Sequence, residues 1–174
     1  MHQRSIPAYR FPLALGLAIF ALFGCPVHAT PSSDAPVLTV AGELAHPITL
    51  DAAALAKLAH VTVQAQAHDV HGSWSGVPLS AILAAAGAPL GKALHGKNLS
   101  LYVRISAVDH YRVVYALAEL DPGFRKDAVI LADRHDGKPL DAKEGPFRVI
   151  APDELRPARW IRQVTRMDVM RAPD

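Results

Sequence analysis

The sequence predicts an α+β domain in which short strands outnumber helices. Short β-branched runs recur between turn residues, few segments have helical spacing, and strands and helices do not alternate regularly. A doubly wound α/β fold requires that alternation, because a crossover helix follows each parallel strand. We therefore expect strands joined mostly by turns.

The first 29 residues have the parts of a signal peptide. Arg4 and Arg10 supply positive charge, residues 11–24 form an apolar run, and Val27-His28-Ala29 has the small-residue spacing that signal peptidases cut. The apolar run is shorter than the ~20 residues of a transmembrane helix. The sequence therefore predicts a periplasmic or secreted protein with no transmembrane anchor.

The single cysteine, Cys25, lies inside this leader. The mature chain would then have no disulfide, no thiolate nucleophile and no thiolate metal ligand. Residues 22–25 loosely resemble a lipoprotein cleavage box, in which Cys25 would be lipidated. Phe23 fits that box poorly, so we favour cleavage after Ala29 and keep the lipoprotein as the alternative.

One domain, residues 37–170, is expected after a flexible lead-in at residues 30–36 that is rich in Pro, Ser and Asp. The whole chain has 18 Lys and Arg against 16 Asp and Glu, and the leader removes two arginines. The mature protein is therefore near neutral. This balance argues against nucleic acid as its main partner.

The amino-terminal half of the domain is expected to combine three strands with two helices. In chain order, we predict strands at residues 37–40, 48–50 and 61–65, and helices at residues 52–58 and 79–86. Asp51 is a good N-cap for the first helix, and Gly87 is placed to end the second. Between them, residues 68–78 are rich in glycine and polar side chains and are interpreted as a loop.

The carboxy-terminal half is expected to be almost entirely β. We predict strands at residues 99–105, 111–115, 128–132, 147–150 and 160–169, with one helical turn at residues 116–120. Asp136-Gly137 is a strong turn signal. Asp136, with nearby Asp133 and His135, could supply acid and base groups, but an exposed hairpin turn is the simpler interpretation.

Two patterns in the 68–78 segment suggest chemistry. His68 and His71, with Asp69 between them, could bind a divalent metal, although a polar loop exposed to solvent is favoured because no third ligand is evident. Residues 72–76, Gly-Ser-Trp-Ser-Gly, place Trp74 where a nucleophile elbow needs serine. A serine hydrolase is therefore disfavoured.

Arginines gather around Trp160 near the end of the chain. They are Arg148, Arg156, Arg159, Arg162 and Arg166. Guanidinium groups beside an aromatic ring suit a planar anionic ligand. The alternative is an ordinary solvated strand edge, on which Arg162 and Arg166 share one face with Trp160 and Val164.

Five short segments also form an ordered series. They are Gly76-Val77-Pro78-Leu79, Asp109-His110-Tyr111, Asp136-Gly137-Lys138-Pro139-Leu140, Gly145-Pro146-Phe147-Arg148-Val149-Ile150-Ala151-Pro152 and Arg159-Trp160-Ile161. In this order they resemble the molybdopterin-binding domain of the sulfite oxidase family, over about residues 37–169. The resemblance implies a mixed β-sheet, barrel-like core with peripheral helices that cradles a molybdenum pyranopterin cofactor for two-electron transfer.

The sequence departs from that family at two places. In family enzymes a cysteine before the Trp74 and Gly76 segment supplies the thiolate bound to molybdenum, whereas residues 65–75 contain none. Loaded family enzymes usually leave the cytoplasm folded, through a leader with adjacent arginines, whereas Arg4 and Arg10 are separated. Both departures favour a protein without the catalytic metal.

We therefore expect a non-catalytic periplasmic module with this fold, with no cofactor and with a small anion or a partner protein as ligand. The candidate pocket residues are His68, His71, Trp74, Asp109, Tyr111, Arg148, Arg159 and Trp160. The alternative is a molybdopterin-dependent oxidoreductase without a cysteine ligand, anchored by Arg148 and Arg159. A metal site at His68 and His71 is a third hypothesis.

Overall fold

The computed structural model describes residues 37–173. The predicted signal peptide, the lead-in and Cys25 lie outside the described residues. Within residues 37–173, no helix has both the length and the apolar character needed to cross a membrane.

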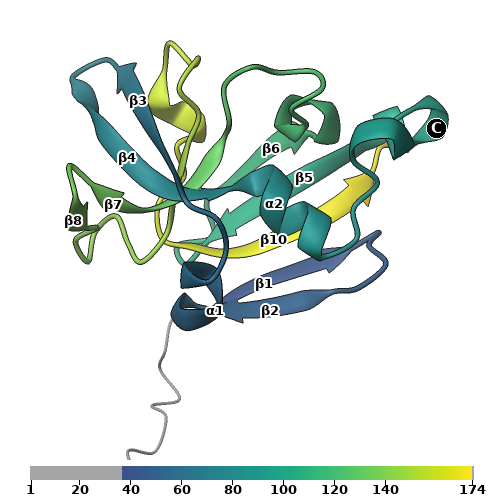
Figure 1. Cartoon of the computed structure of the whole chain (residues 1–174), viewed down its shortest axis with the longest axis horizontal. Helices are drawn as coiled ribbons and strands as arrows, with labels where there is room; N and C mark the ends of the chain where they lie inside the picture. Colours follow the sequence, from purple (N-terminus) through teal and green to yellow (C-terminus); the bar gives the residue numbers. More distant parts are fainter. Residues whose placement is uncertain (1–36, 174) are drawn as a thin grey trace, which may run out of the picture. The chain divides into compact units, whose positions relative to one another are not determined.

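Two five-stranded sheets form the domain (Figure 1). The first has the order β2 (Ile48–Asp51), β1 (Val37–Gly42), β10 (Val164–Arg171), β5 (Leu101–Ala107), β6 (Arg112–Ala116). The second has the order β3 (Val61–Ala67), β4 (Val70–Pro78), β7 (Ile130–His135), β8 (Lys138–Pro139), and β9 (Arg148–Ile150) also pairs with β7. Neither sheet closes on itself within the described residues.

The helical elements are short. They are α1 (Ala52–Ala56), α2 (Leu79–Ala85) and the 3-10 turns η1 (Gly91–Ala93), η2 (Gly96–Ser100), η3 (Leu117–Leu120) and η4 (Pro157–Arg159). The Asp51 carboxylate accepts a hydrogen bond from the Ala54 amide at 2.6 Å, which confirms the predicted N-cap of α1. The prediction of an α+β fold is confirmed.

One hydrophobic core joins the two sheets. Leu38 of β1, Ile105 of β5 and Met167 of β10 are fully buried in it, as are Trp74 of β4 and Ile130 of β7. Helix α2 adds its apolar face, because Leu79, Ile82 and Leu83 point inward at helical spacing.

Two predictions about local structure were wrong. Residues 70–78 form strand β4, which pairs with β3 through a tight hairpin, so that only His68 and Asp69 remain as the predicted loop. Strand β10 begins at Val164, not at Trp160. Trp160 and Arg162 therefore precede the strand and do not share a strand face with Arg166.

Gly76 has a steric role in the Gly-Val-Pro-Leu segment. It lies in β4 opposite Ala132 of β7, where the register of the two strands shifts. A Cβ atom at this position would lie 2.1 Å from the carbonyl oxygen of Leu131. The strands can therefore approach only because residue 76 has no side chain.

We predict that Gly76→Ala lowers the free energy of unfolding by about 3 kcal/mol, because either β4 or β7 must move. Gly137→Ala is the matched control: its φ is +75°, and no atom lies near the added Cβ. In the control, backbone strain alone should lower the free energy of unfolding by roughly 1–2 kcal/mol. Urea unfolding followed by circular dichroism measures both; a smaller loss for Gly76→Ala than for Gly137→Ala contradicts the steric role.

Candidate functional site

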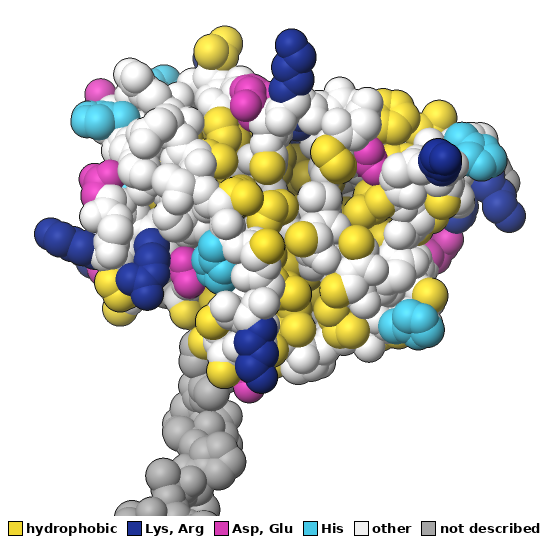
Figure 2. Space-filling view, viewed as in Figure 1, with side chains coloured by type: hydrophobic (Ala, Val, Ile, Leu, Met, Phe, Trp, Pro, Cys, Tyr) yellow, Lys and Arg dark blue, Asp and Glu magenta, His cyan; other side chains and the backbone are white. Residues whose placement is uncertain are grey.

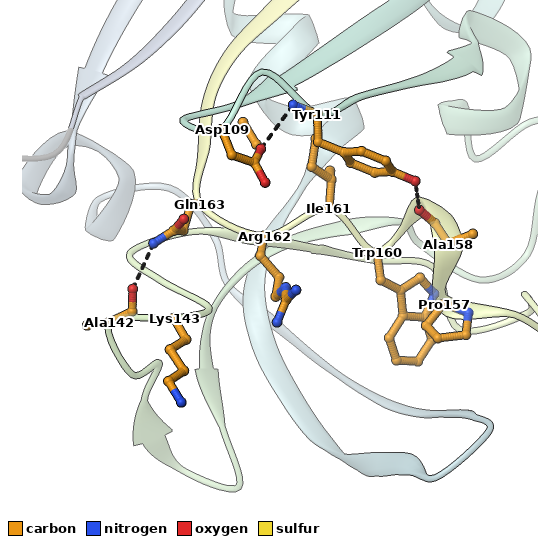
Figure 3. A pocket seen from close by; sticks show the side chains of 11 residues that line it. Asp109, Tyr111, Ala142, Lys143, Pro157, Ala158, Trp160, Ile161, Arg162 and Gln163 are labelled. Atoms are coloured by element: carbon orange, nitrogen blue, oxygen red, sulfur yellow. Dashed lines mark hydrogen bonds between the residues drawn. The ribbon is translucent and has the colours of Figure 1, made fainter.

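A pocket of about 650 Å³ opens where three segments meet (Figure 3). The turn between β5 and β6 forms one wall, the turn between β8 and β9 forms another, and residues 157–163 form the third. The lining residues are Ala107, Asp109, Tyr111, Ala142, Lys143, Pro157, Ala158, Trp160, Ile161, Arg162 and Gln163. Its volume is in the range of small-molecule sites.

Gln163 ties the three segments together. Its side-chain amide donates a hydrogen bond to the carbonyl of Ala142 at 2.8 Å, and its backbone amide donates to the carbonyl of Glu144 at 3.0 Å. Its own carbonyl accepts from the amide of Val108 at 3.1 Å. Gln163 has a φ of +50°, an uncommon conformation for a residue other than glycine, and these three bonds hold it there.

Tyr111 forms a fixed aromatic wall of the pocket. Its hydroxyl donates to the carbonyl of Ala158 at 2.9 Å, although half of the residue is exposed. The Asp109 carboxylate accepts from the Tyr111 amide at 2.9 Å and stabilises the turn, in which His110 has a φ of +68°. The ring of Tyr111 therefore has little freedom to leave the pocket.

The lining contains two cations, Lys143 and Arg162, and one carboxylate, Asp109. Figure 3 shows the two basic side chains extending in the same direction, with Trp160 on the far side of Arg162. Neither cation forms an ion pair with any described residue. The lining therefore has an excess of positive charge that is available to an anion.

Arg148 lies next to the pocket and is only 5% exposed. Its guanidinium carbon is 5.0 Å from the centroid of the Trp74 ring and 5.9 Å from that of Trp160, and its ion-pair partner is Glu144. Burial lowers the pKa of Arg148, and the negative charge of Glu144 opposes that shift. The nearby positive charge of Arg162 lowers the pKa further.

The cluster around Arg148 contains two donors with no described acceptor. The Nε atom of Arg148 and the Nε1 atom of Trp74 are both buried and lack a hydrogen-bond partner among residues 37–173. The indole of Trp160, by contrast, donates to the carbonyl of Ala151 at 3.1 Å. Trp74 also stacks on His135, with ring centroids 3.7 Å apart and planes at 5°.

The side chain of Arg159 lies between two carboxylates and does not line the pocket. Its guanidinium is 2.5 Å from Glu154 and 3.2 Å from Glu119, and it lies 4.1 Å from the centroid of the Tyr115 ring. It also donates to the carbonyl of Val114 at 3.0 Å. Although its neighbours Ala158 and Trp160 line the pocket, Arg159 itself is engaged by two carboxylates.

The histidines of the β3–β4 hairpin do not line the pocket. His68 is in the turn with a φ of +52°, and His71 follows in β4. In the part of the chain that the structure describes, no three His, Cys, Asp or Glu side chains are grouped to hold a metal ion. Figure 2 shows histidine side chains scattered over the visible face, and charged side chains of both signs among them.

The structure thus brings three of the residues predicted for the site together in the pocket: Asp109, Tyr111 and Trp160. Trp74 and Arg148 form the buried cluster against Trp160, whereas His68, His71 and Arg159 lie elsewhere. Sequence reasoning did not propose Lys143, Arg162 and Gln163 for the site. No sequence signal marked Lys143 or Gln163, and Arg162 was noted only as one arginine of five.

Two comparisons place the chain among known proteins. The profile of a family described as oxidoreductase molybdopterin binding domain matches residues 26–174. Among solved structures, the chain is similar to the sulfane dehydrogenase SoxCD from Paracoccus pantotrophus, with a TM-score of 0.62 and 18% sequence identity, over 77% of this chain and 38% of that chain. At this identity the likeness concerns the fold alone. No curated protein matches the sequence.

We predict that Glu144→Gln lowers the free energy of unfolding by about 2 kcal/mol, because it leaves the buried charge of Arg148 without a carboxylate. This value is below that of a fully buried pair, since Glu144 is about a quarter exposed. Glu43→Gln, which breaks a more exposed pair with Arg171, is the control and should change stability by less than ~0.5 kcal/mol.

Urea unfolding followed by tryptophan fluorescence is the measurement. Trp74 and Trp160 are the two tryptophans of the chain, and both lie beside Arg148, so their emission reports on this cluster. Equal stability of the Glu144→Gln and Glu43→Gln proteins would show that Arg148 does not depend on Glu144.

Proposed function

The chain belongs to the oxidoreductase molybdopterin-binding domain family, and from this premise we propose that it is a periplasmic module that binds a small anion without catalysing a reaction. The family resemblance stated from the sequence is confirmed, and so is the fold that it implied. The observation that carries the proposal is the pair of pocket cations, Lys143 and Arg162, that no described carboxylate neutralises.

Members of the family bind molybdopterin, and the donor set of this chain does not fit the molybdenum half of that cofactor. The resemblance places the metal-binding thiolate before Trp74, but residues 37–173 contain no cysteine. Strand β3 and the His68–Asp69 turn occupy that part of the chain. Amide, imidazole and carboxylate groups are poor substitutes for a soft thiolate ligand. We therefore derive no oxygen-atom or electron transfer for this site.

The same pocket fits a small anion well. Backbone and side-chain hydrogen bonds of Gln163 and Tyr111 hold its walls, so little ordering is required on binding. Lys143 and Arg162 supply the charge, and Tyr111 supplies an apolar surface beside it. Both cations are exposed, so we expect an affinity that falls as salt is added.

The alternative function is an oxidoreductase that holds molybdopterin without a cysteine ligand. Family membership favours it, and Lys143 and Arg162 could then bind the phosphate of the cofactor. Plasma mass spectrometry of protein purified from its own host separates the two functions. Molybdenum near one atom per chain would overturn the non-catalytic proposal, and its absence would support it.

The periplasmic location is part of the proposal and rests on residues 1–29. Their charged, apolar and cleavable order supports export, with cleavage after Ala29 favoured over lipidation of Cys25. Fractionation of host cells, with mass spectrometry of the mature amino terminus, tests both points. Full-length protein in the cytoplasm would contradict this part of the proposal.

We predict that the protein binds sulfate or phosphate and that the Lys143→Ala/Arg162→Ala protein binds the same anion at least tenfold more weakly. The physical reason is the loss of both cations from the lining. Isothermal titration at low ionic strength measures the affinity. Lys92→Ala, which removes an exposed cation far from the lining residues in sequence, is the control and should bind like the unchanged protein. Equal loss in both variants contradicts the assigned pocket.

A further inference from the structure

Strand β3 forms a long sheet edge. Its backbone amide and carbonyl groups that point away from β4 have no hydrogen-bond partner among the described residues. Its seven residues, Val61–Ala67, pair with β4 on one side through an unbroken antiparallel register. On its other side, no described residue forms a backbone or side-chain hydrogen bond with it. The hairpin that it forms with β4 is seen at the periphery of the molecule in Figure 1.

The other sheet edges are short or covered. Strands β2, β8 and β9 have only four, two and three residues. On β6, the Arg159 guanidinium donates to the carbonyl of Val114, and the Glu119 carboxylate accepts from the amide of Ala116. Proteins usually protect long edges with Lys, Pro or a bulge, because exposed edges pair with other strands. Strand β3 has none of these devices.

The sequence of β3 is suited to pairing with itself. Residues 61–67 contain no charge, so two copies side by side meet no like-charge repulsion. An antiparallel register centred on Gln64 places Val63 opposite Ala65 of the second copy. The same register places Thr62 opposite Gln66, so apolar side chains meet apolar ones and polar side chains meet polar ones.

We propose that β3 pairs with β3 of a second copy of this chain, forming a symmetric dimer with one sheet continuous across the interface. The symmetry is the twofold type that is commonest among soluble oligomers. At its axis, Gln64 of one copy faces Gln64 of the other, and the two side-chain amides can hydrogen-bond to each other. This inference is independent of the proposed anion pocket, whose lining includes no residue of β3.

Sedimentation velocity of the purified chain across a range of concentrations tests the proposal. We expect a monomer–dimer equilibrium, and Gln64→Lys should weaken dimerisation severalfold because it places two ammonium groups together at the axis. Thr49→Lys puts the same charge on the exposed residue of another edge strand, β2, and should leave the equilibrium unchanged. A monomer at every concentration, or equal effects of the two lysines, would overturn the proposal.

Charge complementation distinguishes a lost interface from a damaged fold. Gln64→Lys and Gln64→Glu should each be mainly monomeric, and an equimolar mixture should restore the dimer because opposite charges then meet at the axis. Failure of the mixture to associate counts against the pairing.

Hydrogen exchange on the unchanged protein provides a second measurement that needs no variant. The backbone amides of β3 that point away from β4, which belong to every second residue, should exchange more slowly as the protein concentration rises, because pairing with the second copy protects them from solvent. Protection that does not depend on concentration would place the dimer contact elsewhere.

Discussion

The buried guanidinium of Arg148 is the constraint on which the candidate site depends. Burying a charge is expensive unless a partner compensates it, and Glu144 is the carboxylate that does so. That pairing fixes the turn before β9, and the same turn presents Lys143 to the pocket. Trp74 and Trp160 lie beside the guanidinium of Arg148, and Trp160 also lines the pocket, so the core and the pocket share this contact.

Next to this buried charge, hydrogen bonds of Gln163, Tyr111 and Asp109 hold the walls of the pocket. Gln163 joins three segments through backbone groups and one amide side chain, and Tyr111 is held by a carbonyl. None of these bonds uses the side chain of Lys143 or Arg162, so both cations remain available to a ligand. In Arg159 the opposite holds, since two carboxylates and a carbonyl engage its guanidinium. Arg159 and Arg162 therefore differ in whether neighbouring acceptors already engage the guanidinium group.

Much of the fold was predictable because its signals are local. Alternating β-branched residues correctly indicated most strands, and Asp51 correctly indicated the N-cap of α1. Strand β4 was missed because its polar, glycine-rich residues look like a loop, and only pairing with β3 and β7 makes them a strand. Trp160 was placed on a strand for a related reason: its backbone follows η4, and its ring is fixed by contacts with Arg148 and Trp74. The pocket was predicted only in part. Contacts between turns that are far apart in the sequence bring Lys143 and Gln163 into it, and no local pattern signals such contacts.

The packing of strands β4 and β7 uses neither a thiolate nor a metal ion. Trp74 is fully buried and stacks on His135, and Gly76 allows β4 to approach β7; neither feature uses a metal. The stability of this region therefore comes from aromatic contacts and strand pairing. In the function proposed here, the lack of a cysteine in residues 37–173 removes the molybdenum ligand, whereas the cavity and its cations do not depend on such a residue. The proposed binding role agrees with that separation, because the charged side chains of the pocket are Lys143, Arg162 and Asp109 and none belongs to the β3–β4 hairpin.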